Sequence, residues 1–333
     1  MEQPAHDVDL FGALRNGDRA ALARAITVIE STRPSDRAIA SELVQRSLPF
    51  SGNSLRLGVT GIPGVGKSTL IDALGSSAIE KGLRVAVLAT DPSSIRSGGS
   101  ILGDKTRMEE LSRSDMAFIR PTASGGFLGG VARRTRETIL LCEAAGYDLI
   151  LVETVGVGQS ELDVDGMTDL NLLLMIPGAG DELQGIKRGI MESADIIVLT
   201  KAQGPNSGQH VVARNALRDA IGFLPPRESG RRPVVLLTDA LTGSGIPALF
   251  DHVNELYQAD KTSGYLSHRR QQQNVRWLHH ALREGLLTRL MDDPLTAAHL
   301  AELEERVKSG AIGPFQAAGE LLDRFRTGDA RPL

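Results

Sequence analysis

A glycine-rich segment, Gly61–Thr69, constrains the fold of this chain more than any other feature of the sequence. It reads GIPGVGKST and matches G-x-x-x-x-G-K-[ST], the pattern of loops whose backbone surrounds phosphate groups. Such a loop needs a buried strand before it and a helix after it, and the flanking runs Leu55–Thr60 and Ser68–Ser77 are typical of these two elements. The segment therefore predicts an anion site at the end of a strand.

The residue types within this loop indicate how it would hold a nucleoside triphosphate. Glycines allow backbone N–H groups to converge on phosphate oxygens without collisions from Cβ atoms, and the following helix directs its N-terminus at the same anion. We expect Lys67 to reach the outer phosphates and the hydroxyl of Ser68 to bind Mg²⁺. The predicted phosphate site comprises Gly61, Gly64, Val65, Gly66, Lys67, Ser68 and Thr69.

Short apolar runs alternate with helical stretches from residue 55 onward. These runs are continuous rather than alternating, which is typical of strands covered by helices on both faces, so we predict an α/β fold with a mainly parallel sheet. The expected strands are Leu55–Thr60, Val85–Thr90, Ala117–Ile119, Leu149–Glu153, Leu170–Ile176, Ile196–Thr200 and Val234–Thr238. The predicted organisation is an N-terminal helical region (1–51), a P-loop nucleotide-binding domain (52–258) and a C-terminal helical arm (259–333).

Composition excludes several other classes of protein. No apolar run approaches the roughly 20 residues that cross a bilayer, and the start, MEQPAHDVDL, lacks the features of a signal peptide. A single cysteine, Cys142, fits a reducing compartment. The formal charge of −4 and the aromatic content of 4% both argue against binding to nucleic acid. We therefore expect a cytoplasmic protein that binds neither membranes nor nucleic acid.

Acidic residues follow two of the predicted strands. Glu153 ends the run 149–153, where the second acidic element of a P-loop site is expected, and Gly156 follows at a position that can contact the γ-phosphate. Asp91 ends the run 85–90 in the same way. Because a metal-bound triphosphate needs oxygen ligands and an oriented water, we expect these acids to lie near the metal ion.

Four further runs carry a family resemblance. The chain, over about residues 10–290, resembles the G-protein chaperones of adenosylcobalamin-dependent acyl-CoA mutases, among them the methylmalonyl-CoA mutase-associated GTPase. An older label for this family is lysine/arginine/ornithine transport ATPase or kinase. The runs that carry the resemblance are DPSSIRSGGSILGDKTRM (91–108), GGVARRTRET (129–138), ETVGVGQSE (153–161) and PGAGDELQGIKRGIME (177–192).

The resemblance implies a GTPase that uses Mg²⁺, hydrolyses GTP to GDP and phosphate, and gates the loading and protection of the cofactor of a partner mutase. It also implies a homodimer that pairs through its helical C-terminal arm. By the same resemblance, Asp91 and Asp104 belong to a first switch region and Glu153 to a second, all near the metal ion and the attacking water. A third switch, 178–189, would signal to the mutase through Asp181, Gln184 and Lys187.

The base-reading motif departs from the usual N/T-K-x-D. The chain has Thr200-Lys201-Ala202-Gln203, so a neutral amide stands where an acid normally accepts hydrogen bonds from guanine. The second base-sensing element, usually Ser-Ala, is Asp239-Ala240. Our hypothesis is a swap in which Asp239 accepts the amide of Gln203 and turns its carbonyl toward guanine. Weaker GTP binding, relaxed base choice that includes ATP or XTP, and lost specificity with retained hydrolysis all stay open.

Two other functions are alternatives to a GTPase chaperone. The first is a P-loop kinase or ATPase, although no second substrate motif is visible in the sequence. The second is a nickel metallochaperone GTPase, although the chain has only one cysteine and 7 scattered histidines. On the predicted long helix around His268–Met291, Trp277 is interpreted either as a core residue or as a dimer contact.

Overall fold

The computed structural model describes residues 9–91, 108–123, 128–154, 164–176, 188–202 and 207–328. Next to some gaps, only the backbone is described, as at Asp91. The chain forms two compact units, Met1–Gln273 and Asn274–Leu333, and each is treated on its own below. Among the described residues, no helix is long and apolar enough to cross a membrane.

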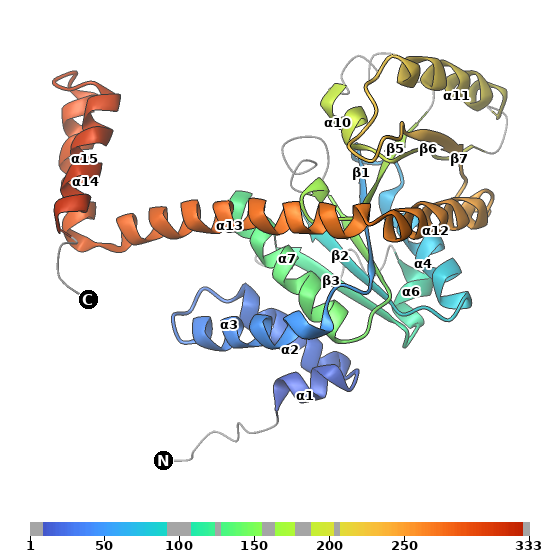
Figure 1. Cartoon of the computed structure of the whole chain (residues 1–333), viewed down its shortest axis with the longest axis horizontal. Coiled ribbons are helices and arrows are strands. Elements are labelled where there is room, and N and C mark those ends of the chain that lie inside the picture. Colours follow the sequence, from blue (N-terminus) through green and yellow to red (C-terminus); the bar gives the residue numbers. More distant parts are fainter. Residues whose placement is uncertain are drawn as a thin grey trace. The chain divides into compact units, whose positions relative to one another are not determined.

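The first unit is built on a seven-stranded sheet in the order β3-β2-β4-β1-β5-β6-β7 (Figure 1). Every neighbouring pair of strands is parallel, so the predicted α/β architecture with a parallel sheet is confirmed. The strands are β1 (Leu55–Gly61), β2 (Val85–Asp91), β3 (Ala117–Ala123), β4 (Leu149–Glu153), β5 (Leu170–Met175), β6 (Ile196–Leu199) and β7 (Val234–Leu237).

The helices lie mostly where the apolar spacing predicts them. The helix that follows β7, Ile246–Ser263, ends where the chain reaches Gly264, because the left-handed φ of 80° at that glycine terminates the helix. The helices are α1 (Leu10–Arg15), α2 (Arg19–Glu30), α3 (Asp36–Ser47), α4 (Lys67–Glu80), α6 (Glu109–Arg113), α7 (Leu128–Ala144), α10 (Arg188–Ser193), α11 (Ser207–Gly222), α12 (Ile246–Ser263), α13 (Tyr265–Asp292), α14 (Pro294–Lys308) and α15 (Pro314–Gly328), with a 3₁₀ turn η1 at Leu48–Phe50.

Both faces of the sheet are buried, as the continuous apolar runs predict. Alternate residues of β1 and β5, such as Leu57 and Leu172, pack in one cluster with apolar residues of α4 and α12. The intervening residues of β5 and β6, such as Leu173 and Ile197, pack on the other face with α10 and α11. The second unit has a small core of its own, formed by Leu290, Leu303, Ile312, Ala317 and Leu321.

A charged pair lies inside the first unit. Arg56 on β1 donates to both carboxylate oxygens of Glu143 on α7, at 2.9 Å each, and both residues are less than one-tenth exposed. Glu143 also accepts the backbone N–H of Gly52. Burial, reinforced by the like charge of Arg56, lowers the pKa of the nearby Arg136 to about 10. The pair therefore fastens α7 to the central strand.

Replacing Glu143 with Gln tests this contribution. The substitution leaves the buried guanidinium of Arg56 without its counter-charge, so we expect the free energy of unfolding to fall by about 3 kcal/mol. Urea denaturation followed by circular dichroism measures the change. The matched control is Glu109→Gln, which removes an exposed ion pair with Arg113 and costs less than about 1 kcal/mol. Equal losses in the two variants would contradict the assignment.

Candidate nucleotide site

The phosphate loop lies between the carboxyl end of β1 and the start of α4. Gly61 has φ 151°, and a Cβ there would lie 2.7 Å from the carbonyl oxygen of Leu174 on β5. Gly64 and Gly66 have φ values of 76° and 104°, which place them in the left-handed region. Because glycine adopts these conformations without a Cβ clash, the observed backbone explains why the motif requires glycine.

The lysine of the loop folds back on the loop itself. Lys67 is 8% exposed, and its Nζ donates to the carbonyl oxygen of Gly61 at 2.9 Å and to that of Ile62 at 3.3 Å. Beneath the loop, Val65 is fully buried. The side chain of Lys67 therefore packs against the backbone of the loop, and its contact with the outer phosphates stays a prediction from the motif.

Ser68 and Glu153 are brought together, although 85 residues separate them in the sequence. The Ser68 hydroxyl donates to Oε1 of Glu153 at 3.2 Å. The contact arises because β4 lies beside β1, with Glu153 opposite Val59. A hydroxyl and a carboxylate are the oxygen ligands that Mg²⁺ prefers, so this pair fits the expected metal ion.

The other predicted residues near the metal are only partly described. Asp91 ends β2, which lies next to β4, so its backbone is at the same edge of the sheet as Glu153. Its side chain lies outside the description, and so does the whole of Asp104. The predicted residues Gly156, Asp181, Gln184, Lys187 and Gln203 also lie outside the described residues.

Two threonines at this edge form hydrogen bonds that the sequence did not predict. Thr154, the residue after Glu153, donates its hydroxyl to that of Thr60 at 3.0 Å and its N–H to the carbonyl of Val59. Thr200 donates its hydroxyl to the carbonyl of Val65 at 2.8 Å. The first contact fixes the chain just beyond the metal-site acid, and the second joins the base side to the phosphate loop.

On the base side, Lys201 has a left-handed backbone with φ 59°, which is uncommon for a residue with a side chain. Its Nζ donates to the carbonyl of Gly64 at 3.3 Å. The ends of β6 and β7 are joined because Ala202 donates its N–H to the carbonyl of Thr238. The two predicted base-reading segments, 200–203 and 239–240, therefore start side by side next to the phosphate loop.

Asp239 shapes its own loop. Its Oδ1 accepts the backbone N–H groups of Leu241 at 3.0 Å and Thr242 at 3.3 Å, and its own N–H donates to the carbonyl of Ser244. Ala240 is partly buried and packs against the main core. Because Oδ1 is occupied in this turn, the predicted swap with Gln203 would have to use Oδ2. The turn itself was not expected from the sequence.

The fold and this edge of the sheet define a P-loop nucleoside triphosphatase. A family model described as "Methylmalonyl Co-A mutase-associated GTPase MeaB" matches residues 22–294. The chain belongs to this family of GTPases, and the resemblance seen in the sequence is confirmed.

Relatives and a solved structure agree with the family match. The chain is 50% identical over 327 residues, 97% of both proteins, to "Probable GTPase Rv1496" of Mycobacterium tuberculosis. It is 44% identical over 331 residues to "Methylmalonic aciduria type A homolog, mitochondrial" of the mouse, covering 96% of this chain and 79% of that protein. The crystal structure of an LAO/AO transport system kinase matches with a TM-score of 0.76 and 37% identity, over 98% of this chain and 99% of the other.

Substitutions at Asp239 separate its turn-forming role from a role that needs its charge. Asp239→Asn keeps an oxygen that can accept the two N–H groups, so we expect GTP affinity within about twofold of wild type. Asp239→Ala removes that acceptor, and the loss of about 1 kcal/mol corresponds to affinity roughly fivefold weaker. Titration with a fluorescent GTP analogue measures both. An Asn variant as weak as the Ala variant would show that the carboxylate charge is required.

Proposed function

We propose that this chain is a GTP-driven chaperone of an adenosylcobalamin-dependent acyl-CoA mutase, and that GTP binding and hydrolysis gate loading and protection of the mutase cofactor. The observation that carries the enzymatic half is the Ser68–Glu153 pair beside a complete phosphate loop. The mutase half is supported by the family description and by the name of the mouse relative, which refers to methylmalonic aciduria.

Hydrolysis of GTP needs no covalent intermediate with the protein, because phosphoryl transfer to water depends mainly on positioning and charge neutralisation. In our proposal, backbone N–H groups of the loop and the amine of Lys67 hold the outer phosphates. Ser68 and Glu153 would hold the Mg²⁺ ion, together with Asp91 and Asp104. The ion would supply charge neutralisation on the phosphate oxygens.

Glu153→Gln tests this assignment. The amide keeps the shape of the side chain but removes its charge, so we expect kcat for GTP to fall by roughly 100-fold, while binding of GDP without Mg²⁺ stays close to wild type. Phosphate release and nucleotide titration measure the two quantities. Thr154→Val, which removes only the neighbouring hydroxyl, serves as the control and should retain more activity. A Gln variant with wild-type kcat would contradict the role given to Glu153.

On the base side we propose that GTP is the physiological nucleotide. Lys201, which contacts the carbonyl of Gly64 in the phosphate loop, would cover the base, and Ala240 lies in the loop closed by Asp239. Gln203 would then offer its carbonyl in place of the usual carboxylate. A neutral acceptor makes weaker hydrogen bonds than a charged one, so we expect weaker guanine discrimination than in proteins with the usual acid.

We also propose that the chain forms a homodimer through helix α13. Helix α13 exposes a row of large apolar side chains at three- and four-residue spacing, which follows one face of a helix. Val275, Leu278, Leu282 and Leu286 are each more than half exposed, whereas Trp277 is partly buried and lies beside His280. We propose that a second copy of the chain covers this face, as the family resemblance implies.

The experiment that tests the chaperone role uses the full chain and purified mutase. Co-purification is measured with GDP and with a non-hydrolysable GTP analogue, and GTP hydrolysis is measured with and without the mutase. We expect nucleotide-dependent association and faster hydrolysis in the presence of a methylmalonyl-CoA-type mutase. If no acyl-CoA mutase binds and none accelerates hydrolysis, the chaperone assignment fails while the GTPase assignment stands.

A further inference from the structure

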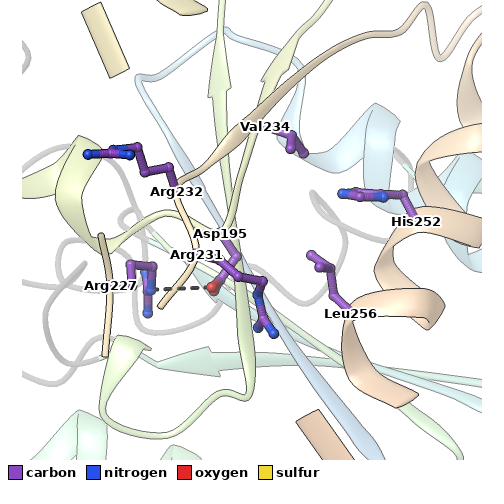
Figure 2. A pocket seen from close by; sticks show the side chains of 7 residues that line it. All are labelled: Asp195, Arg227, Arg231, Arg232, Val234, His252 and Leu256. Carbon is purple, nitrogen blue, oxygen red and sulfur yellow. Dashed lines mark ion pairs between the residues drawn. The ribbon is translucent and has the colours of Figure 1, made fainter. Parts of the chain in front are cut away.

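A cluster of charged residues lies at the amino ends of β5, β6 and β7, the edge of the sheet opposite the phosphate loop. Its centre is Arg227, which lies between α11 and β7 and is only 9% exposed in its side chain. Nη2 contacts Oδ1 of Asp165 at 2.9 Å, Nε contacts Oδ1 of Asp195 at 3.2 Å, and Nη1 donates to the carbonyl of Ser193. Figure 2 shows Arg227 turned toward Asp195 beside a cavity of about 350 Å³.

The same cluster reaches the first turns of α13. Oδ1 of Asp165 also accepts Nη2 of Arg269 at 2.9 Å, and its backbone carbonyl accepts Nε2 of Gln273 at 3.0 Å. Gln273 is fully buried and donates a second hydrogen bond to the carbonyl of Thr168. The carboxylate of Asp165 is therefore shared by Arg227, in the segment between α11 and β7, and by Arg269 near the start of α13.

The contacts of Arg227 lie at the ends of two chain connections that leave the nucleotide edge of the sheet. Beyond Glu153, which contacts the phosphate loop, the chain passes through residues 155–163 and arrives at Asp165. Beyond β5, where Leu174 lies against Gly61, it passes through residues 177–187 and α10 and arrives at Ser193 and Asp195. Both connections begin at the nucleotide edge, and both end at contacts with the guanidinium of Arg227. These two places lie on opposite edges of the sheet, which is about 20 Å deep along the six residues of β5.

The charges of Arg227 and Arg269 stabilise the ionised forms of the two carboxylates, Asp165 and Asp195. Burial alone would raise the pKa of Asp165, but the guanidiniums of Arg269 and Arg227 outweigh it and hold the pKa below its ordinary value. Burial raises the pKa of Asp195, and Arg227 opposes that shift. Because a buried charge is costly once its partner moves away, displacement of either connection disturbs the other and the helix start that shares Asp165.

We propose that Arg227 is a positioning residue for GTP turnover. It holds together the ends of the two connections that leave the nucleotide site, and through Asp165 and Arg269 it passes a change of nucleotide state to the first turns of α13 (265–273). The inference goes beyond the proposed chaperone role and does not depend on it, because it requires only GTP binding and hydrolysis by this chain.

Arg231 offers a matched control in the same loop. It lines the same cavity and also pairs with a buried carboxylate, although its own side chain is 32% exposed. Its guanidinium donates to both oxygens of Asp260 on α12, at 2.5 and 2.7 Å. Asp260 is 3% exposed. Loss of either arginine therefore removes a cation from a buried carboxylate, while only Arg227 bonds to the ends of the two connections.

The test compares Arg227→Met, Arg227→Lys and Arg231→Met in the full chain, without any partner. Hydrogen exchange is measured with GDP and with a non-hydrolysable GTP analogue, and steady-state hydrolysis is measured below the melting temperature of each variant. We expect wild type and Arg231→Met to show a nucleotide-dependent difference in exchange at residues 265–273. In Arg227→Met that difference is lost, kcat falls roughly fivefold or more and KM for GTP stays within about twofold.

Arg227→Lys keeps the charge, but a lysine cannot span Asp165, Asp195 and the Ser193 carbonyl. We therefore expect it to lose the nucleotide-dependent exchange and kcat as Arg227→Met does. It replaces the methionine variant in the comparison if that variant fails to fold. Three results would overturn the proposal. One is a wild-type chain with no nucleotide-dependent exchange at 265–273. The second is an Arg231→Met variant that loses as much as Arg227→Met, and the third is an Arg227→Lys variant that behaves as wild type. None of these outcomes involves the mutase, so each is distinct from failure of the chaperone role.

Discussion

The parallel pairing of β1 with β4 and β5 is the constraint on which the site depends. Parallel strands bring their carboxyl ends to one edge of a sheet, where α/β proteins bind their ligands. Here that edge gathers a phosphate loop from β1, an acid from β4 and a lysine that follows β6. The glycine backbone of the loop completes the arrangement, because a Cβ at Gly61 would meet the carbonyl of Leu174. The nucleotide site is thus a consequence of strand order.

The opposite edge of the sheet is held by charges rather than by glycine. Arg56 with Glu143, Arg270 with Asp169, and Arg227 with Asp165 and Asp195 form ion pairs with little exposure at the amino ends of the strands. Such pairs contribute specificity of arrangement more than net stability. They fix where α7, α13 and the chain between α11 and β7 begin or end. The nucleotide site therefore lies at the carboxyl edge of the sheet, and the ion pairs that attach the surrounding elements lie at the amino edge.

The parallel α/β sheet and the phosphate loop could be predicted from the sequence because both depend on local patterns of residues. The continuous strand runs predicted the parallel sheet, and Glu153 could be paired with Ser68 because both follow strands of one sheet. The hydroxyl contacts of Thr154 and Thr200 could not be predicted because their partners, another hydroxyl and a backbone carbonyl, leave no motif in the sequence. Arg227 and Asp165 are 62 residues apart, and no spacing rule connects them. The turn that Asp239 forms with its own backbone neighbours was not expected, and its predicted contact with Gln203 stays a prediction because Gln203 lies outside the described residues.

We infer that this edge of the sheet binds and hydrolyses GTP although the usual base-reading acid is replaced by Gln203. The most direct measurement is phosphate release by the purified full chain with GTP, ATP and XTP, side by side in the presence of Mg²⁺. We expect the highest kcat/KM with GTP, and inorganic phosphate together with the nucleoside diphosphate as the only products. Equal or faster turnover of ATP, or transfer of the phosphoryl group to a second substrate, would contradict it.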